Sequence, residues 1–308
     1  MARKRRGSPV HGWLVLDKPQ GMSSARAVAA VRRLLDAEKA GHGGTLDPLA
    51  TGVLPIALGE ATKTVGFAMD GRKTYRFTLA WGEERTTDDA EGEVVARSTV
   101  RPTRAAIEAV LPRFTGALMQ LPPAYSAIKV EGRRAYALAR GGETPALTAR
   151  PIQVFRLALV ANPDPGHASF EAEVGKGTYV RALGRDLATA LGTLAYVAAL
   201  RRITVGRFTE AHAISLENLA SLVHSPGPFE HLLPIETALD DIPALALTEA
   251  EADRMRCGQT VLPLRPADRK LVLELGNGHA VCVTCKEKLV ALAEIAGGAL
   301  RPVRVLNL

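Results

Sequence analysis

The sequence predicts an α+β fold with a large N-terminal domain and a small, strand-rich C-terminal one. Strand-like and helix-like segments are mixed without the regular strand–helix–strand rhythm of a parallel α/β sheet. The 308 residues exceed one typical domain. Ser225-Pro226-Gly227-Pro228, Pro234 and Pro243 interrupt the pattern as a linker does, and short apolar segments predominate from about Leu247 onward.

The first predicted strand is Gly12–Asp17, which the turn at Lys18-Pro19-Gln20-Gly21 ends. Ser23 or Ser24 can then cap a helix that ends before Gly41. The apolar residues of this helix recur at helical spacing: Val28, Val31, Leu34 and Leu35. A loop dense in glycine follows.

The middle of the chain mixes both element types. Four segments are predicted as strands: Tyr75–Trp81, Ser169–Val174, Thr178–Arg181 and Ile203–Phe208. Three segments are predicted as helices: Thr103–Leu111, Arg133–Arg140 and Ala182–Ala190.

The last sixty residues or so favour strands. A helix is predicted over Thr248–Arg256. Four short strands are predicted after it: Leu271–Leu275, Ala280–Val283, Lys288–Ile295 and Arg301–Leu306. Short strands in such a small unit suggest a β-barrel.

Composition is that of an ordinary globular protein, with 47% hydrophobic and 23% charged residues. No apolar run approaches the roughly 18 residues that span a bilayer, and Met1–Arg6 leads into Gly7-Ser8-Pro9 rather than an apolar signal core. The three cysteines all lie beyond residue 256, so they cannot supply a disulfide framework for most of the chain. We therefore expect a cytoplasmic protein.

The net charge of +7 resides in two short segments. Arg3–Arg6 is a run of four cations, and Tyr125–Arg150 holds five cations against two acids. Concentrated positive charge attracts polyanions, which favours a nucleic-acid partner. A solvated tail and a solvated helix face explain the same charges equally well.

The most informative motif is the loop Gly41–Gly52, GHGGTLDPLATG. Its glycines let a backbone approach a ligand, and Leu46 and Pro48 restrain Asp47 between them. The loop lacks the spacing of a phosphate-binding loop and places an acid where an anion would sit, which argues against a nucleotide triphosphatase or kinase. A turn with a solvated acid is the alternative interpretation.

Three further sequence features could lie beside this loop in the folded protein. Tyr75 offers a ring for stacking a base and a phenol for proton transfer, although tyrosines at such positions are commonly core residues. Tyr179 and Arg181 lie on one side of the predicted strand, where Arg181 could pair with Asp47 or simply be exposed. Leu200-Arg201-Arg202 suits a pocket edge beside a phosphate but also a helix end.

Seven motifs in order give the chain a specific likeness: it resembles the TruB family of tRNA pseudouridine(55) synthases across about residues 11–210. The motifs are Val15-Leu16-Asp17-Lys18-Pro19-Gln20-Gly21, the loop GHGGTLDPLATG, Leu58-Gly59-Glu60-Ala61-Thr62-Lys63, the Tyr75 strand, Pro122-Pro123-Ala124-Tyr125-Ser126-Ala127-Ile128-Lys129, Lys176-Gly177-Thr178-Tyr179-Val180-Arg181 and Leu200-Arg201-Arg202.

The resemblance implies roles for individual residues. Asp47 is the implied catalytic aspartate, Tyr75 the tyrosine beside the target uracil, and Arg181 the cation paired with Asp47. His42 is implied to enter the RNA loop and help to hold it open. Tyr179 and Leu200 are implied to line the uracil pocket. Seven cations are expected at the RNA backbone: Lys18, Lys63, Lys129, Arg133, Arg134, Arg140 and Arg202.

The resemblance also implies a domain arrangement and partners. Residues 1–10 form a basic tail, 11–240 a catalytic domain of pseudouridine-synthase type built on a mixed sheet, and 246–308 a small PUA-like barrel that binds RNA. The basic segment 124–150 matches an insertion that guide-RNA-dependent relatives lack. We therefore expect a monomeric enzyme that acts on the T-arm loop of tRNA without a guide RNA.

Pseudouridine formation changes no oxidation state and needs no outside group, so no cofactor is expected. The uracil must leave its stack before it can turn, which requires base flipping. A single carboxylate can stabilise or capture the sugar cation that develops, as in glycosidases. Attack of Asp47 on C1′, its attack on the base, and its removal of a sugar proton all remain open.

Two alternative interpretations concern the cysteines and the RNA-binding surface. Cys257, His279, Cys282 and Cys285 could supply four zinc ligands, but only one close pair exists, so no metal is expected. A non-catalytic RNA-binding protein or tRNA-folding chaperone could keep the same surface. Such a binder has no need for Asp47, because a carboxylate facing RNA repels phosphate.

Overall fold

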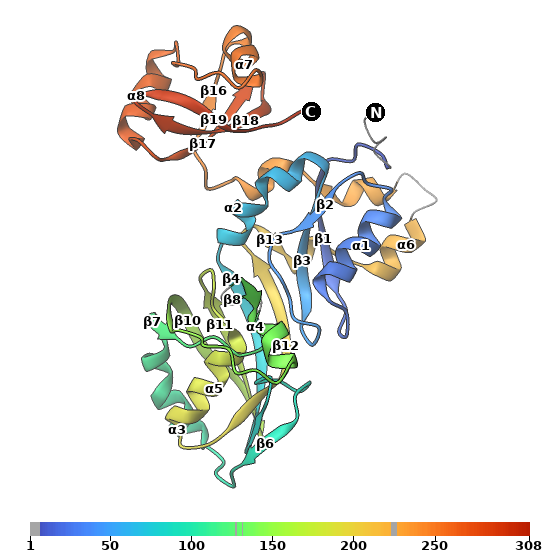
Figure 1. Cartoon of the computed structure of the whole chain (residues 1–308), viewed down its shortest axis with the longest axis vertical. Helices are drawn as coiled ribbons and strands as arrows, with labels where there is room; N and C mark the ends of the chain where they lie inside the picture. The colour runs from blue at the N-terminus through green and yellow to red at the C-terminus, as the bar shows by residue number, and fades with distance from the viewer. Residues whose placement is uncertain (1–6, 127, 131, 223–226) are drawn as a thin grey trace.

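The computed structural model describes residues 7–126, 128–130, 132–222 and 227–308. The basic residues Arg3–Arg6 lie outside the described residues. Figure 1 shows an elongated molecule, with the C-terminal domain at one end and α3 (Arg104–Val110) and β6 (Val94–Arg97) toward the other.

A mixed β-sheet forms the centre of the larger, N-terminal part of the molecule. Its strand order is β14-β1-β3-β12-β4-β11-β10-β7, and β2, β13 and β15 pair beside this path. The bounds are β1 Gly12–Lys18, β2 Ala40–His42, β3 Thr51–Leu58, β4 Lys73–Trp81, β7 Gly116–Gln120, β10 Arg150–Asp164, β11 His167–Val174, β12 Ala195–Val205, β13 Phe208–Thr209, β14 Ala213–Ser215 and β15 Leu232–Leu233. The predicted α+β class is confirmed, and β12 joins the two halves of the sheet by pairing with β3 and β4.

Helices cover this sheet. The predicted first helix is confirmed as α1 Ser24–Leu34, where the Ser23 hydroxyl accepts a hydrogen bond from Arg26 N. Further helices are α2 Val65–Asp70, which follows the 3-10 turn η1 Gly59–Thr64, then α5 Val180–Ala190 and α6 Leu216–Leu222. Shorter 3-10 turns are η2 Leu111–Phe114, η3 Glu210–His212, η4 Gly227–His231 and η5 Ile235–Ala238.

Two predictions around the site need correction. The predicted strand Thr178–Arg181 is wrong, because the chain turns at Gly177, with φ of +83°, and Arg181 lies in the first turn of α5. The predicted helix Arg133–Arg140 is shorter. Its first two residues form β9 Arg133–Arg134, paired with β8 Lys129–Val130, and α4 covers only Ala135–Arg140.

The C-terminal domain is an open sheet with two helices. β16 Ala244–Ala246, β17 Ala280–Cys285, β18 Lys288–Ala296 and β19 Ala299–Val305 lie in that order. The predicted helix is confirmed as α7 Glu249–Arg256. Leu271–Leu275 belongs to α8 Pro266–Leu275 instead of a strand, and the strands of the described residues do not close into the predicted barrel.

The two parts share an apolar cluster. Trp13 and Phe208 of the larger part pack with Leu289 and Leu306 of the smaller one. Cys282 packs in this shared cluster and Cys285 in the core of the C-terminal domain, so each behaves as a small apolar residue.

Lys63, which was predicted at the RNA backbone, also joins the two parts. Its Nζ donates to Glu60 at 2.5 Å and to Val305 O at 2.7 Å. The Glu60 carboxylate accepts in addition from Asn307 N at 2.7 Å. These hydrogen bonds lower the pKa of Glu60 although its burial acts in the opposite direction. Lys63 therefore neutralises a carboxylate and ties down the end of β19.

Candidate active site

Asp47 lies in the loop between β2 and β3, and that loop is held from several sides. Ser24 Oγ donates to Leu46 O at 2.9 Å and accepts from Leu46 N at 2.8 Å. Gly21 N donates to Pro48 O at 2.8 Å. Gly52 has a φ of +96°, and a Cβ there would lie 2.3 Å from Arg202 O. The loop therefore presents one carboxylate in a fixed backbone setting.

Two predicted RNA-backbone cations lie beneath this loop instead of facing RNA. Lys18 is 0% exposed, and its Nζ donates to Pro19 O, Met22 O and Pro48 O at 2.9, 2.7 and 3.3 Å. Burial lowers the pKa of Lys18 to about 8. Its ammonium satisfies the backbone carbonyls around the Asp47 loop, so the predicted phosphate contact is wrong.

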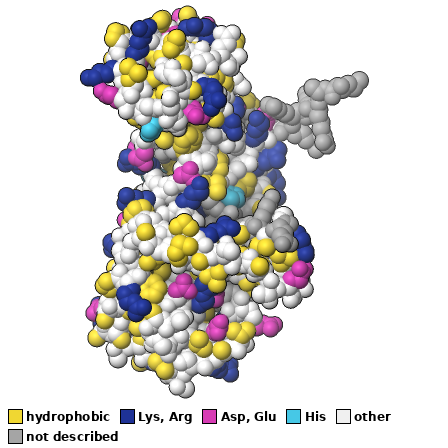
Figure 2. Space-filling model, turned by 60° about the vertical axis from the view of Figure 1, so that its left-hand side comes forward, with side chains coloured by type: hydrophobic (Ala, Val, Ile, Leu, Met, Phe, Trp, Pro, Cys, Tyr) yellow, Lys and Arg dark blue, Asp and Glu magenta, His cyan; other side chains and the backbone are white. Residues whose placement is uncertain are grey.

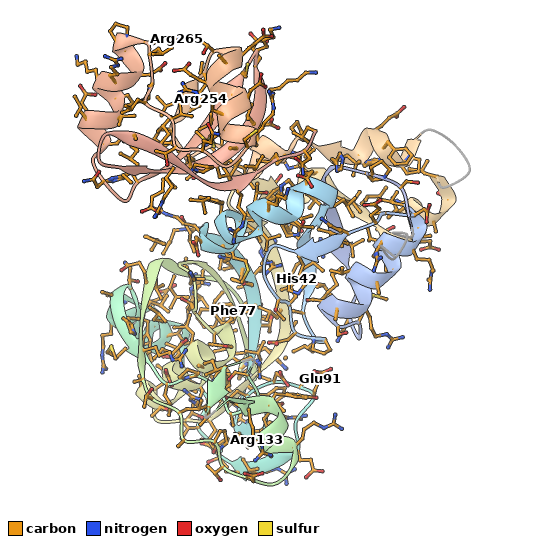
Figure 3. All side chains as sticks on the ribbon, turned by 45° about the horizontal axis from the view of Figure 1, so that its top comes forward. His42, Phe77, Glu91, Arg133, Arg254 and Arg265 are labelled. Carbon is orange, nitrogen blue, oxygen red and sulfur yellow. The ribbon has the colours of Figure 1, made fainter. Side chains whose placement is uncertain are left out.

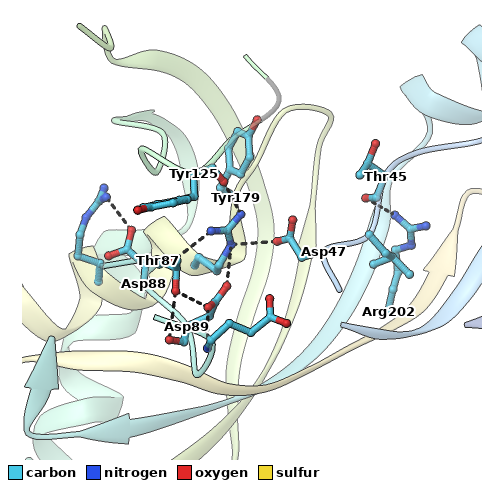
Figure 4. A network of polar contacts seen from close by, with 12 residues as sticks. Thr45, Asp47, Thr87, Asp88, Asp89, Tyr125, Tyr179 and Arg202 are labelled. Atoms are coloured by element: carbon cyan, nitrogen blue, oxygen red, sulfur yellow. Dashed lines mark hydrogen bonds and ion pairs between the residues drawn. The ribbon is translucent and has the colours of Figure 1, made fainter. Parts of the chain in front are cut away.

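Arg202 needs the same correction. It is 1% exposed and donates through Nε to Val53 O at 2.8 Å and through Nη2 to Gly44 O at 3.0 Å. Its third contact, from Nη1 to Thr45 O, is 3.4 Å long (Figure 4). The guanidinium joins both ends of the Asp47 loop.

Arg181 connects Asp47 to two other segments. Its Nε donates to Asp47 Oδ2 at 2.9 Å, and its Nη1 and Nη2 donate to Thr87 O and Tyr125 O at 2.8 and 2.9 Å (Figure 4). Asp89 lies 3.5 Å from the same guanidinium. Arg181 is buried, so a positive charge is held beside Asp47 with little water around it.

The segment that carries Asp89 was missed by sequence reasoning. It lies between β5 Glu83–Arg85 and β6, and its cluster of acids, Asp88, Asp89, Glu91 and Glu93, was the available signal. Burial raises the pKa of Asp88 to about 6, although Arg185, whose Nη1 lies 3.1 Å from it, and Arg181 oppose the rise. Burial, Asp89 and Asp47 also raise the pKa of Glu91.

Asp47 and Arg181 stand between two cavities. The larger one, about 710 Å³, is lined by the acidic segment and by Tyr125, Tyr136 and Arg140. The smaller one, about 340 Å³ and called here the base pocket, is lined by all of the predicted uracil contacts: Tyr75, Tyr179 and Leu200. The Asp47 carboxylate therefore lines the same pocket as these aromatic and apolar side chains.

The pairing of β4 with β12 creates one wall of the base pocket. Tyr75 is opposite Arg202 and Leu200 is opposite Phe77 in this ladder. Tyr179 precedes α5, and its backbone N donates to the buried Gln120 Oε1 at 2.9 Å while Gln120 Nε2 donates to Tyr179 O at 3.1 Å. Burial raises the pKa of the Tyr179 phenol. Gln120 is a second residue that sequence reasoning missed.

Lys73 is a third missed residue, two positions before Tyr75 on β4. Its buried ammonium lines the base pocket and donates to Gly71 O at 2.5 Å and to Met69 O. Burial lowers the pKa of Lys73 to about 8. The alternation of β4 places Lys73 and Tyr75 on the same face of the strand, which the sequence could have shown.

His42 lies on β2 and is half-buried. Its ring Nδ1 is buried and has no hydrogen-bond partner among the described residues. Burial, followed by the nearby Arg202, lowers the pKa of His42. In the view of Figure 3, Glu91 lies between His42 and Arg133.

The insertion contributes exposed cations. Arg133 pairs with Glu143 at 3.0 Å, and Arg140 lies over the Tyr136 ring with 5.8 Å to its centroid. The side chains of Lys129 and Arg134 lie outside the described residues. Figure 2 shows Lys and Arg side chains spread along the length of one face, with Asp and Glu side chains among them.

Solved structures match nearly the whole chain. A chain in the crystal structure of a Cbf5–Nop10–Gar1 complex is 25% identical, with a TM-score of 0.72 over 96% of this chain and 84% of that one. A chain of the archaeal box H/ACA sRNP Nop10–Cbf5 complex, 24% identical, gives 0.71 over 99% and 92%. The fold is therefore that of the matched chains in these two complexes.

Family models and curated relatives define the class of protein more narrowly than the fold does. The model of the TruB family pseudouridylate synthase N-terminal domain matches residues 32–180, and that of the tRNA pseudouridylate synthase B C-terminal domain matches residues 181–240. The chain belongs to the TruB family of pseudouridylate synthases. It is 57% identical to tRNA pseudouridine synthase B of Bradyrhizobium diazoefficiens, over 97% of this chain and 86% of the relative, and 54% identical to that of Caulobacter vibrioides over the whole of both chains. None of the helices in the described part of the chain is long and apolar enough to cross a membrane.

Proposed function

We propose that this protein converts the uridine at position 55, in the T-arm loop of tRNA, into pseudouridine. The relatives named tRNA pseudouridine synthase B support the reaction and the RNA class. The observation that carries the proposal is the Asp47 carboxylate held 2.9 Å from Arg181 Nε in the lining of the base pocket. A protein that only bound or folded RNA would gain nothing from an acid there, because a carboxylate repels phosphate.

The reaction balances without any added group. The N1–C1′ bond breaks, the uracil turns, a C5–C1′ bond forms, the C5 proton leaves and N1 takes up a proton. Asp47 attacks C1′, attacks the base or helps to remove a sugar proton. Tyr75 stacks on the uracil and moves a proton late in the reaction. No cofactor takes part in this scheme.

RNA binding extends beyond the base pocket. His42, with its unsatisfied ring nitrogen, enters the RNA loop and helps to hold it open. The insertion 124–150 contacts phosphates through Arg133 and Arg140, and the domain 246–308 contacts the RNA outside the loop. The enzyme acts as a monomer in the cytoplasm and without a guide RNA.

The test is the substitution Asp47→Asn, which keeps the size of the side chain and removes the carboxylate. We expect normal folding and tRNA binding but no product when pseudouridine is mapped in a tRNA transcript. Asp253→Asn, at an exposed aspartate of the C-terminal domain that pairs with Arg256, is the matched control. Asp47→Asn activity within about tenfold of the wild type, or about 1.4 kcal/mol, would remove Asp47 from the chemistry.

A further inference from the structure

The start of α5 is held by a side chain from another part of the chain. Gln120, the last residue of β7, is only 3% exposed. Its Oε1 accepts a hydrogen bond from Tyr179 N at 2.9 Å, and its Nε2 donates to Tyr179 O at 3.1 Å. The carboxamide therefore pairs with the backbone of Tyr179 as a neighbouring strand would, and both of its polar atoms have a partner.

Tyr179 receives this support from outside because it does not cap its own helix. It is the N-cap residue of α5 and has no side-chain capping hydrogen bond. N-cap residues usually fix a helix start with a short side-chain oxygen, as Ser23 does for α1. The Tyr179 side chain lines the base pocket instead. The position of the first turn of α5, and with it that of Arg181, therefore depends on a residue 59 positions before Tyr179.

Gln120 lies behind the wall of the base pocket. It lines a separate cavity of about 410 Å³ together with Leu118 and Leu183, and it is absent from the described residues that line the base pocket. Arg181, in contrast, reaches Asp47 from the first turn of α5, with 2.9 Å between Nε and Oδ2. Any influence of Gln120 on Asp47 therefore passes through the backbone of α5.

We infer that Gln120 is a positioning residue for the reaction, and this inference rests on the proposed function. By holding Tyr179 N and O, Gln120 sets the depth and the rotation of the first turn of α5. That turn directs the Arg181 guanidinium to Asp47 and places Tyr179 in the wall of the base pocket. A displacement of about 1 Å in an active site can reduce a rate by about a hundredfold. Two hydrogen bonds outside the pocket therefore maintain the geometry of the pair formed by Asp47 and Arg181.

The first test replaces the carboxamide with an unbranched apolar group of similar size, Gln120→Met. In full-length protein we expect the single-turnover rate of pseudouridine formation in a tRNA transcript to fall at least about tenfold. The Kd for the same transcript, measured by fluorescence anisotropy in the Asp47→Asn background, should stay within about twofold. Because Arg181 is then held less closely beside Asp47, the acid limb of the rate profile should also move to higher pH.

A second variant restores the contacts in a way that depends on pH. Gln120→Glu keeps an acceptor for Tyr179 N, but its ionised carboxylate has no proton to donate to Tyr179 O. The protonated carboxylic acid makes both hydrogen bonds, so the rate of Gln120→Glu relative to the wild type should rise as pH is lowered from about 8 to about 5. Gln120→Met should show no such recovery. Four charged residues lie around this position and are the same in both variants: Arg113, Arg150, Arg185 and Asp186.

Leu118→Ala is the matched control, because it enlarges the same cavity and keeps the carboxamide of Gln120. It should lower the free energy of unfolding in chemical denaturation and leave the rate within about twofold. A Gln120→Met rate within about threefold of the wild type would overturn the inference, and so would an equal loss of rate in Leu118→Ala.

A parallel loss of rate and tRNA affinity in Gln120→Met would also overturn it, because that result assigns Gln120 to RNA binding. If Gln120→Met does not fold, the pH dependence of Gln120→Glu decides, and a constant ratio to the wild-type rate contradicts the inference. Failure of the proposed function shows separately, as missing pseudouridine at position 55 with the wild-type protein.

Discussion

Replacing Arg181 with methionine removes a buried cation but keeps much of the volume of the side chain. In the wild-type protein the Arg181 guanidinium lies beside two carboxylates, those of Asp47 and Asp89. It also donates hydrogen bonds to two backbone carbonyl oxygens, Thr87 O and Tyr125 O. Removing one partner of a buried ion pair costs about 3–5 kcal/mol. The Asp47 side chain is 35% exposed and that of Asp89 only 3%, so most of the cost falls on Asp89. We therefore expect the free energy of unfolding to fall by about 3 kcal/mol.

The same substitution should change the pH dependence of the reaction in a defined direction. Without Arg181 the carboxylates of Asp47 and Asp89 lose the positive charge beside them, which disfavours the ionised form of each. Since the proposed reaction uses the Asp47 carboxylate, the acid limb of the rate profile should move to higher pH. Arg181→Lys keeps the charge but loses the planar fork that joins three segments, so it should retain part of the activity.

The assay is single-turnover conversion of a tRNA transcript between about pH 5 and pH 9, a range that covers a raised carboxylate pKa. Chemical denaturation of each variant supplies the stability change. Arg185→Met is the matched control, because Arg185 lies one turn further along α5 and pairs with Asp88 instead of Asp47. Wild-type rates and an unmoved acid limb in Arg181→Met would refute the reasoning, whatever the change in stability.

Three further predictions concern other parts of the site. Tyr75→Phe should keep stacking and slow proton transfer, whereas Tyr75→Ala should lose both. Equal small effects on single-turnover rate would make Tyr75 a core residue. Replacing Arg133 and Arg140 together by alanine should lower the slope of log Kd against log salt by up to about two units, and an unchanged slope would show that neither touches phosphate. Because burial raises the pKa of Asp88 to about 6, the folded protein keeps a proton there that the unfolded chain releases near its ordinary aspartate pKa of about 4. Stability should therefore fall by up to about 3 kcal/mol as pH rises from about 4 to 6, and chemical denaturation should find this loss absent in Asp88→Asn.

Local sequence patterns predicted most helices and strands, because these elements depend mainly on residues that are close in the sequence. The Ser23 cap and the alternation of Tyr75–Trp81 belong to this kind, and both are confirmed. Leu271–Leu275 was misjudged because four apolar residues among five fit a strand or a buried helix. Pro266 at the start and Gly276 after the end of α8 were the better signals.

Sequence reasoning failed for those site residues that are charged and yet buried in the structure. Lys18 and Arg202 carry full charges, so solvent or phosphate is their expected environment. Their actual partners are backbone carbonyls, which have no sequence signature, and β3 and β12 bring Arg202 beneath the loop from about 150 residues away. The same is true of Thr87 O and Tyr125 O, which hold Arg181 through backbone atoms.

The rigid setting of Asp47 determines which partner has to change shape. Ser24, Lys18 and Arg202 already hold backbone carbonyls of that loop by hydrogen bonds before any RNA arrives. The loop that carries Asp47 therefore loses little conformational entropy when RNA binds. Most of the free-energy cost of reaching a productive complex comes from the nucleic acid, whose target base must unstack. RNAs whose loops are already loosened should reach that state with the smaller penalty. Selection among substrates then depends largely on how readily each RNA deforms.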